Sequence, residues 1–490
     1  MSSVDYQLVV GLEVHVQLKT LTKLFCGCST TFGAAPNTQT CPVCLGHPGT
    51  LPVLNREAIR LAIRTGLALN STIPPTTKWD RKNYFYPDLP KGYQISQFDQ
   101  PICQGGELKL PGDETSSPRT IRITRAHLEE DAGKSMHDES SGSADSRIDL
   151  NRTGTPLLEI VSEPDIRSAE EAKQYLTELK LLLTYLQVSD CNMQEGSLRV
   201  DANVNLHLQR GDELIATPIV EIKNLNSFRA VERALVYEAQ RQREVFEDTG
   251  QRIGEAPKQT RGWDDNLQVT KVQREKEESS DYRYFPDPDL VPIMLPESWV
   301  TELKSDLGAL PAALRDRLKT EFGLSQYDAD VIVNQGPDMV AYFEAVASNL
   351  KDAKRASNWI QQDVMRTLND MEYSLADFSI KADDLAKLLQ LIEAGELDNS
   401  RGRDVYQWLL DHPGTPEEGM KALGIASVGS DDLLDLCKQL IGEHPSAVSD
   451  FKAGKKQALG AMIGAARKLN PNANPGKVKD LLSQLISHED

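Results

Sequence analysis

The sequence of 490 residues predicts an α+β fold in which strands and helices are segregated along the chain. Strand-like alternation of apolar and polar residues runs through about the first 295 residues, interrupted by helical segments. From Pro296 onward, helix-period segments separated by prolines replace the strands. We therefore expect a mixed domain over 1–295, a helical domain over 296–410 and a small helical tail domain over 411–490.

Two strands of the first domain have clear polar faces. In GLEVHVQL (11–18), Glu13 and His15 share one face and leucines and valines occupy the other. In SLRVDANVNLHL (197–208), Asp201 lies on the polar face. Taken alone, Glu13 and His15 are best explained as the solvent-exposed side of an amphipathic strand.

Two helices of this domain carry terminal signals. The segment 168–187 begins with Ser168 and has Glu171 three residues later, which is a capping-box pattern. The segment 227–248 is followed by Gly250, a typical helix terminator.

The bulk composition is that of a globular protein, with 39% hydrophobic and 26% charged residues. No apolar stretch is long enough to span a bilayer, and the N-terminus resembles neither a signal peptide nor a transit peptide. We expect a cytoplasmic protein without a membrane partner. The net charge of −19 argues against nucleic-acid binding by the whole surface.

The segment 451–479 departs from this acidic background, because it contains basic residues and no acid. A solvated helical face is the usual explanation of such a run and is slightly favoured when the segment is considered alone. Contact with an RNA backbone is the alternative. The basic residues are Lys452, Lys455, Lys456, Arg467, Lys468, Lys477 and Lys479.

Four of the seven cysteines form a C-x-C-x12-C-x2-C pattern, made by Cys26, Cys28, Cys41 and Cys44. Short pairs at the two ends of a loop favour a tetrahedral zinc site. The alternative is redox chemistry at Cys41 and Cys44, which would leave Cys26 and Cys28 without a role. Because four thiolates fill the coordination sphere, we expect a structural zinc. The other three cysteines are interpreted as core residues.

Several acids lie within otherwise apolar strands. Glu159 stands between Leu158 and Ile160, and Glu221 stands between Val220 and Ile222. Burying an acid is costly unless it is paired or binds a metal, so converging carboxylates favour Mg²⁺. A neighbouring histidine is compatible with a site that also accepts Mn²⁺. The acidic turn in RAHLEEDAGKS (125–135) offers further ligands, namely Glu129, Glu130 and Asp131.

The absence of a P-loop motif limits how this protein could bind ATP. AGKS (132–135) ends like a P-loop, but Leu128 stands where the first glycine is required. Any ATP would therefore be held by carboxylates and a metal. Two segments place aromatic residues before Pro-Asp: NYFYPDLP (83–90) and DYRYFPDPDLVP (281–292). They are explained as packed turns or, alternatively, as an aromatic platform for an adenine or a tRNA base.

Taken together, long motifs in order along nearly the whole chain resemble the B subunits of the bacterial glutamyl/aspartyl-tRNA amidotransferases, the GatB family. The motifs are VVGLEVHVQL (9–18), FDQPI (98–102), HLEEDAGKS (127–135), DLNRTGTPLLEIVSEPD (149–165), EGSLRVDANVN (195–205), EIKNLNSF (221–228) and DYRYFPDPDL (281–290).

The resemblance implies an antiparallel-sheet cradle domain with a zinc knuckle at 26–44, followed by the helical and tail domains. It implies a ligase activity in which ATP and Mg²⁺ phosphorylate the side-chain carboxylate of Glu-tRNA(Gln) or Asp-tRNA(Asn). Ammonia derived from glutamine then displaces the phosphate. The implied partners are an amidase-type A subunit and a small C subunit in a heterotrimer, together with the misacylated tRNA.

Mapped by motif, the resemblance implies metal and catalytic roles for six residues: Glu13, His15, Glu130, Glu159, Asp201 and Glu221. The choice between Glu129 and Glu130 stays open, because the strand alternation slips between Ile123 and Ala126. The resemblance also favours RNA contact by the basic tail. Two rival interpretations are a non-catalytic tRNA-binding adaptor and a zinc hydrolase, and four thiolate ligands argue against the latter.

Overall fold

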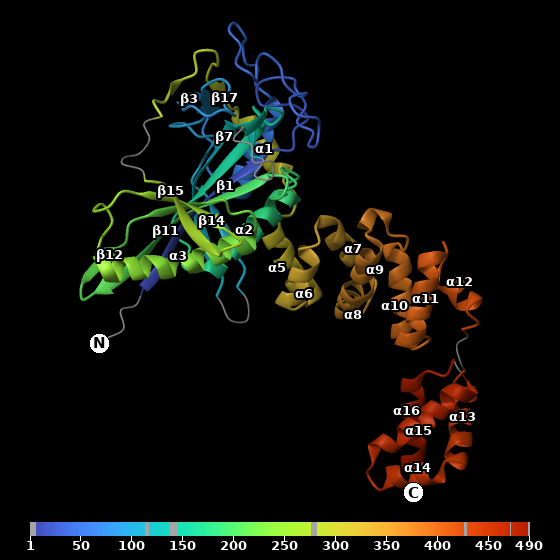
Figure 1. The fold of residues 1–490 in the computed structure, drawn as a ribbon. Coiled ribbons are helices and arrows are strands. Elements are labelled where there is room, and N and C mark those ends of the chain that lie inside the picture. The colour runs from blue at the N-terminus through green and yellow to red at the C-terminus, as the bar shows by residue number, and fades with distance from the viewer. Residues whose placement is uncertain are drawn as a thin grey trace. The chain divides into compact units, whose positions relative to one another are not determined.

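The computed structural model describes residues 6–112, 117–137, 146–275, 282–425, 429–470 and 472–488. Its contacts divide the chain into two compact units, Met1–Ala313 and Leu314–Asp490 (Figure 1). Strands and helices build the first unit, whereas the described part of the second is helical. The predicted α+β class is confirmed, and the predicted division into three domains stays a prediction.

One large sheet organises the first unit, with 13 strands among the described residues. Its central strand β1 (Tyr6–Gln17) lies between β10 (Pro156–Ser162) and β11 (Leu198–Arg210). Beyond β10 follow β7 (Arg119–Glu130), β4 (Tyr93–Ser96), β3 (Asp80–Asn83) and β16 (Phe285–Pro286). Beyond β11 follow β13 (Val220–Lys223), β14 (Gln259–Asp264) and β15 (Val269–Glu275).

Short strands extend this framework: β12 (Glu213–Ala216) pairs with β11, and β5 (Cys103–Gln104) and β6 (Glu107–Leu110) pair with β7. Two separate pairs are β2 (Thr76–Thr77) with β17 (Ile293–Met294) and β8 (Lys134–His137) with β9 (Ser146–Asp149). Among the strands that the structure describes, pairing is antiparallel except between β13 and β14, which run parallel. The expected antiparallel sheet is therefore observed with one parallel exception.

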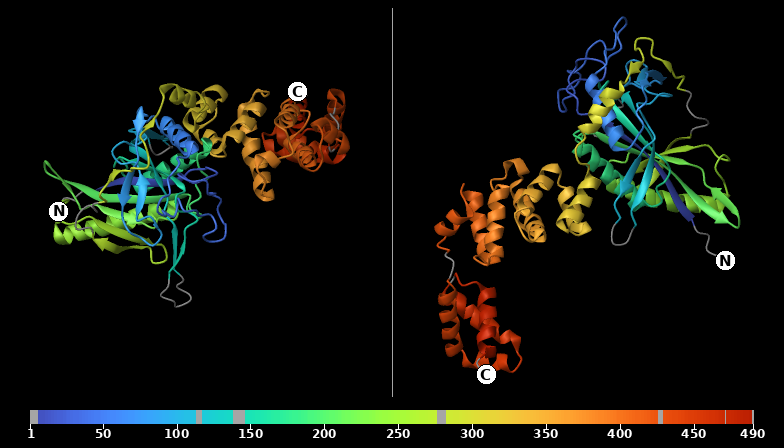
Figure 2. Two further views of the ribbon diagram at one scale, coloured as in Figure 1. Left: turned by 90° about the horizontal axis from the view of Figure 1, so that it is seen from above. Right: turned by 180° about the vertical axis from the view of Figure 1, so that it is seen from behind.

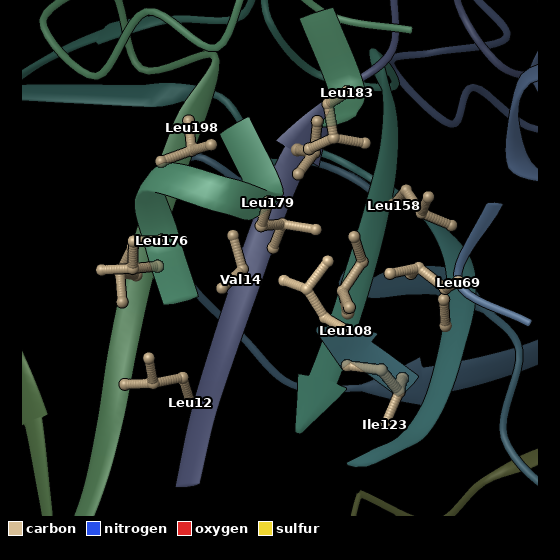
Figure 3. Close-up of a cluster of buried hydrophobic side chains, with 14 of the residues drawn as sticks. Leu12, Val14, Leu69, Leu108, Ile123, Leu158, Leu176, Leu179, Leu183 and Leu198 are labelled. Atoms are coloured by element: carbon tan, nitrogen blue, oxygen red, sulfur yellow. The ribbon is translucent and has the colours of Figure 1, made fainter. Parts of the chain in front are cut away.

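One face of the sheet forms the hydrophobic core of this unit. Leu12, Val14 and Val16 of β1 are completely buried on this face, together with the apolar residues of the neighbouring strands. Figure 3 shows Leu179 of helix α2 (Ala169–Tyr185) beside Val14, and Leu176 and Leu183 of the same helix belong to the same core. Burying each such side chain contributes about 1.5–3 kcal/mol. The core thus fixes which face of β1 carries Glu13 and His15.

Helices α1 (Arg56–Ala68) and α3 (Phe228–Thr249) contribute to the same core. Helix α3 ends at Gly250 as predicted, and Ser168 caps α2, but the predicted capping box is only half formed, because the bond to the Glu171 carboxylate comes from Arg167 and not from Ser168. Ser168 accepts a hydrogen bond from the backbone N–H of Glu171, and the Glu171 carboxylate accepts one from the N–H of Arg167. Gly250 adopts φ 66°, a left-handed conformation that glycine accommodates without strain.

Strand β7 contains a β-bulge. Val161 of β10 lies opposite Arg125, whereas the next residue, Ser162, lies opposite Ile123. Thr124 is therefore an extra residue in β7, and the alternation of side chains resets there. After the bulge, Ala126 and Leu128 face the core. This bulge explains the slip that the sequence pattern contains.

The remaining elements are helical. Helix α4 (Glu297–Ser305) belongs to the first unit, and α5 (Pro311–Phe322) crosses the boundary between the units. The second unit continues with α6 (Gln326–Val333), α7 (Pro337–Ala347), α8 (Ala353–Trp359), a π-helical turn (Ile360–Val364), α9 (Met365–Met371), a 3-10 turn (Leu375–Asp377), α10 (Ala382–Glu393), α11 (Asn399–Asp411) and α12 (Pro416–Ala422).

The C-terminal helices are α13 (Ser430–Glu443), α14 (Pro445–Lys452), a 3-10 turn (Lys456–Ala458), α15 (Leu459–Leu469) and α16 (Pro475–His488) (Figure 2). They enclose a small core of their own that includes Cys437, Met462 and Leu482. Cys103, Cys191 and Cys437 are buried, as predicted. Among the described residues, no helix has the length and apolar character required to cross a membrane.

Candidate functional site

The register of the central strands gathers polar residues on the face opposite the core. His15 of β1 lies opposite Glu159 of β10, and Glu13 lies opposite Asp201 of β11. Glu159 in turn lies opposite His127 of β7. Because directly opposed residues project to the same side of a sheet, these side chains form one cluster.

His15 is the centre of this cluster. Its Nδ1 lies 3.6 Å from Oε1 of Glu129 and 3.9 Å from Oε2 of Glu159. Its Nε2 lies 3.9 Å from Oδ2 of Asp201. Glu13 completes the group and accepts a hydrogen bond of 2.9 Å from the Asn203 amide.

The cluster contains two overlapping sets of potential metal ligands, Glu13/His15/Asp201 and His15/Glu129/Glu159. In each set the donor atoms lie within 4.8 Å of one another. Opposite ligands of an octahedral Mg²⁺ are separated by about 4.2 Å, twice the Mg–O distance. The donors are mostly carboxylate oxygens, which Mg²⁺ prefers, so the residues present fit a hard divalent cation. We refer to these five residues as the acid cluster.

Charge coupling within the acid cluster shifts its pKa values. Burial opposes protonation of His15, but its hydrogen bond to Glu129 and the negative charges of Glu159 and Asp201 outweigh burial and raise its pKa to about 9. Burial, followed by the charge of Glu159, raises the pKa of Glu13. Burial also acts on Glu129, but His15 and Lys82 hold the pKa of that carboxyl below its usual range. The imidazolium thus balances part of the carboxylate charge.

The structure places Glu129, and not Glu130, in the acid cluster. After the bulge, Glu130 has the same orientation as Leu128, on the side of the core. Its carboxylate pairs with Lys91 and accepts a hydrogen bond of 3.2 Å from the Ile95 backbone N–H. Glu130 lines a cavity of about 200 Å³ next to Cys26 and Cys44. The burial of Ala126 and Leu128, which the structure provides, assigns Glu129 to the polar face by the alternation of side chains.

Glu221 lies at the edge of the site and belongs to neither ligand set. The Lys223 ammonium bridges it to the acid cluster, at 2.8 Å from Oε1 of Glu221 and 2.5 Å from Oδ2 of Asp201. Thr260 donates a further hydrogen bond of 3.1 Å to Glu221.

A cavity of about 390 Å³ opens beside the acid cluster, which is within the size range of small-molecule sites. His15, Glu129 and Asp201 line it together with three cationic side chains, Lys82, Arg199 and Lys223. Arg199 donates a hydrogen bond of 2.8 Å to Asp131. Acids that suit a metal and cations that suit phosphate oxygens therefore border one cavity.

The sequence interpretation missed these three cations. Arg199 and Lys223 occupy polar positions of β11 and β13, so the alternation contained a signal for them. Lys82 reaches the cavity from β3, and its contacts could not be read from one strand alone. Its Nζ lies 5.9 Å from the ring centre of Tyr84 and 5.1 Å from that of Tyr282.

The two aromatic segments lie side by side. Strand β16 pairs with β3, and the Asn83 amide donates hydrogen bonds to the carbonyls of Tyr282 and Arg283. Phe98 stacks on Tyr284 with ring centres 4.1 Å apart. Phe98 remains 54% exposed, so this stack is accessible from solvent.

The cysteine quartet is gathered as the spacing predicts, with all four Sγ atoms within 4.8 Å of one another. The Sγ atoms of Cys41 and Cys44 are 3.9 Å apart, close to the roughly 3.8 Å that separates thiolates around tetrahedral zinc. A hydrogen bond from Cys26 lowers the pKa of Cys44 to about 4, and the charge of Lys23 acts in the same direction. The residues present therefore fit a structural zinc.

The basic run lies on the C-terminal bundle. Lys452, Lys455, Arg467 and Lys468 are exposed, whereas the side chain of Lys456 lies outside the described part of the structure. Lys455 pairs with Asp450 at 3.0 Å. Both the solvated-face and the RNA-contact interpretations are compatible with this exposure.

Comparison with known proteins assigns both units. The family model of the GatB/GatE catalytic domain matches residues 8–301, and that of the GatB domain matches residues 341–486. A curated relative from Rhodopirellula baltica is 62% identical over 98% of this chain and 96% of its own length. Others from Caldanaerobacter subterraneus and Geobacter sulfurreducens are each 46% identical over 98% of this chain and 99% of their own length. All three are named as B subunits of aspartyl/glutamyl-tRNA(Asn/Gln) amidotransferases.

Proposed function

Because this chain belongs to the GatB family, we propose that it is the tRNA-amidating subunit that activates a misacylated aminoacyl-tRNA. Its substrates would be Glu-tRNA(Gln), Asp-tRNA(Asn) or both. The reaction is a carbon–nitrogen ligation with ATP as the phosphoryl donor and ammonia, released from glutamine by a partner, as the nitrogen source.

The observation that carries this proposal is the acid cluster beside a cavity bordered by cations. In the first step, an oxygen of the tRNA-borne carboxylate attacks the γ-phosphorus of ATP, and ADP leaves. In the second step, ammonia attacks the carbonyl carbon of the acyl phosphate, and inorganic phosphate leaves as the amide forms. The first step brings two anions together, so positioning and charge neutralisation supply most of the catalysis.

The side chains divide this work. The acid cluster (Glu13, His15, Glu129, Glu159 and Asp201) would hold Mg²⁺, which would supply charge neutralisation and orientation at the phosphoryl group. Lys82, Arg199 and Lys223 also border the cavity and are suited to bind phosphate oxygens. Glu129 replaces Glu130 in this proposal, because Glu130 pairs with Lys91.

The remaining parts have structural and binding roles in the proposal. The cysteine quartet would hold one structural zinc. Residues 1–295 would form the catalytic cradle, 296–410 a helical domain and 411–490 the tRNA-binding tail, with the basic run contacting the RNA backbone. An amidase-type A subunit and a small C subunit would complete a heterotrimer, in agreement with the relatives, which are named as subunits of a larger enzyme.

Reconstitution with the two partner subunits tests the proposal. The complex is supplied with Glu-tRNA(Gln) and Asp-tRNA(Asn) in parallel, and phosphate release and amide formation are measured with and without Mg²⁺. We expect Mg²⁺-dependent ATP cleavage that requires a misacylated tRNA. Tight tRNA binding without ATP cleavage would instead identify a non-catalytic adaptor.

A further inference from the structure

His127 is a buried histidine next to the acid cluster that the sequence interpretation left without a role. It lies on β7, directly opposite Glu159, and only 5% of its surface is exposed. Its Nε2 lies 3.4 Å from Oε2 of Glu159 and 3.9 Å from Oε2 of Glu129. A polar group so deeply buried requires a hydrogen-bonding partner, and the two carboxylates are within reach.

Arg125 determines which nitrogen of His127 carries the proton. The guanidinium Nε lies 3.4 Å from His127 Nδ1 and donates to it. Because a guanidinium can only donate, Nδ1 must accept, and the proton of the neutral ring resides on Nε2. The N–H of His127 is therefore on Nε2, the nitrogen that lies near the carboxylates of Glu159 and Glu129.

Two histidines consequently hold the same two carboxylates. Oε1 of Glu129 faces His15, and its Oε2 faces His127. Oε2 of Glu159 lies near both rings, at 3.9 Å from His15 and 3.4 Å from His127. Of the two, His15 lines the cavity. His127 contacts the carboxylates from the β7 side.

We propose that His127 is a positioning residue that orients Glu159 and Glu129 for a divalent cation, with Arg125 fixing its tautomer. The inference rests on the proposed function, because it assigns His127 to the ligands of that cation. Hydrogen-bond partners of metal ligands usually contribute about 10–100-fold to metal affinity. Removing the His127 donor should therefore weaken cation binding by about this factor, without removing any ligand.

The experiment measures Mn²⁺ affinity of the full chain by electron paramagnetic resonance, with thermal unfolding in parallel. His127→Leu removes the donor and should weaken binding by about 10–100-fold. His127→Gln places an amide N–H near the position of Nε2 and should restore affinity to within about threefold of the wild type. His127→Asn ends near Nδ1, cannot reach Glu159, and should behave like His127→Leu.

The outcomes separate positioning from mere structural support. A folded His127→Leu variant with wild-type Mn²⁺ affinity would overturn the inference, as would equal affinities of the Gln and Asn variants. If His127→Leu does not fold, the Gln and Asn pair decides. A wild-type chain that binds no Mn²⁺ would instead refute the proposed metal site itself, and the inference with it.

Discussion

Glu129 and Glu130 provide a matched pair of substitutions, because the two carboxylates are adjacent in sequence, similarly buried and directed to opposite sides of the sheet. Each can be changed to glutamine, which keeps the shape and removes the charge. We expect Glu129→Gln to impair metal binding and Glu130→Gln to impair stability.

The magnitudes follow from the contacts. Glu129 lies 3.6 Å from the His15 nitrogen, and at an effective dielectric constant of about 20 this separation corresponds to about 4–5 kcal/mol per pair of unit charges. A cation bound beside Glu129 would lose a similar interaction energy when Glu129 is changed to glutamine. The loss is partly offset because glutamine keeps one oxygen ligand. We therefore expect Glu129→Gln to weaken Mn²⁺ binding by about 10²–10³-fold. Activity of the reconstituted complex with Glu-tRNA should fall accordingly.

Glu130→Gln acts through Lys91. Both partners of this ion pair are almost fully buried, with exposed side-chain fractions of 4% and 6%. Removing one partner of a buried pair costs about 3–5 kcal/mol, because the other charge stays buried. We expect a lower urea midpoint of the first unfolding transition of the full chain and an Mn²⁺ affinity within about threefold of the wild type. The assignment would be refuted if Glu130→Gln lost the metal while Glu129→Gln retained it.

Three further predictions concern pH, zinc and RNA. Mn²⁺ affinity should rise by about tenfold per pH unit up to about pH 9, because the raised pKa of His15 means that a proton must leave this ring when a metal binds. An affinity that stays constant between about pH 6.5 and 8.5 would contradict this. The purified chain should contain about one zinc, and Cys44→Ser should reduce both the zinc content and the unfolding temperature; a zinc-free wild type of undiminished stability would count against the site. Removing residues 411–490 should weaken tRNA binding and flatten its dependence on salt concentration, as measured by filter binding from about 50 to 200 mM salt. Equal tRNA affinity after truncation would instead support the interpretation of the basic run as a solvated helical face.

The sequence predicted which faces the polar side chains of the regular strands occupy. Glu13 and His15 share a face because β1 is regular, and Asp201 follows from the regular alternation in β11. The cysteine quartet was predicted from spacing alone, because short ligand pairs impose local geometry. In these cases the deciding property, the face of a strand or the spacing within a loop, belongs to one segment of the chain, where periodicity and spacing are informative.

The choice between Glu129 and Glu130 could not be made in this way. The bulge at Thr124 shifts the alternation by one residue, and a shift of one residue moves every later side chain to the other face. Counting from Arg119 therefore gives the wrong face, whereas counting from the buried Leu128 gives the correct one. Burial is a tertiary property, and it became known only with the structure.

The three cations of the cavity illustrate a second limit. Lys82, Arg199 and Lys223 come from three strands, and nothing in their sequence spacing brings them together. Arg199 and Lys223 lie on the neighbouring strands β11 and β13, whereas four strands separate β3 from β11, so only the three-dimensional arrangement of the sheet brings Lys82 to the same cavity. Strand order depends on non-local pairing, which a single sequence does not encode in a local pattern.

The central place of β1 also governs when the site can exist during synthesis. Glu13 accepts its hydrogen bond from Asn203, which is 190 residues later in the chain. At ribosomal rates of about 5–20 residues per second, about 10–40 s separate the synthesis of these two residues. Until β10 (Pro156–Ser162) is made, β1 has neither neighbouring strand, and it lacks its second neighbour until β11 follows. For most of that time Leu12, Val14 and Val16 lack their core. The nascent chain must therefore protect an unpaired apolar strand before it can take up a cation.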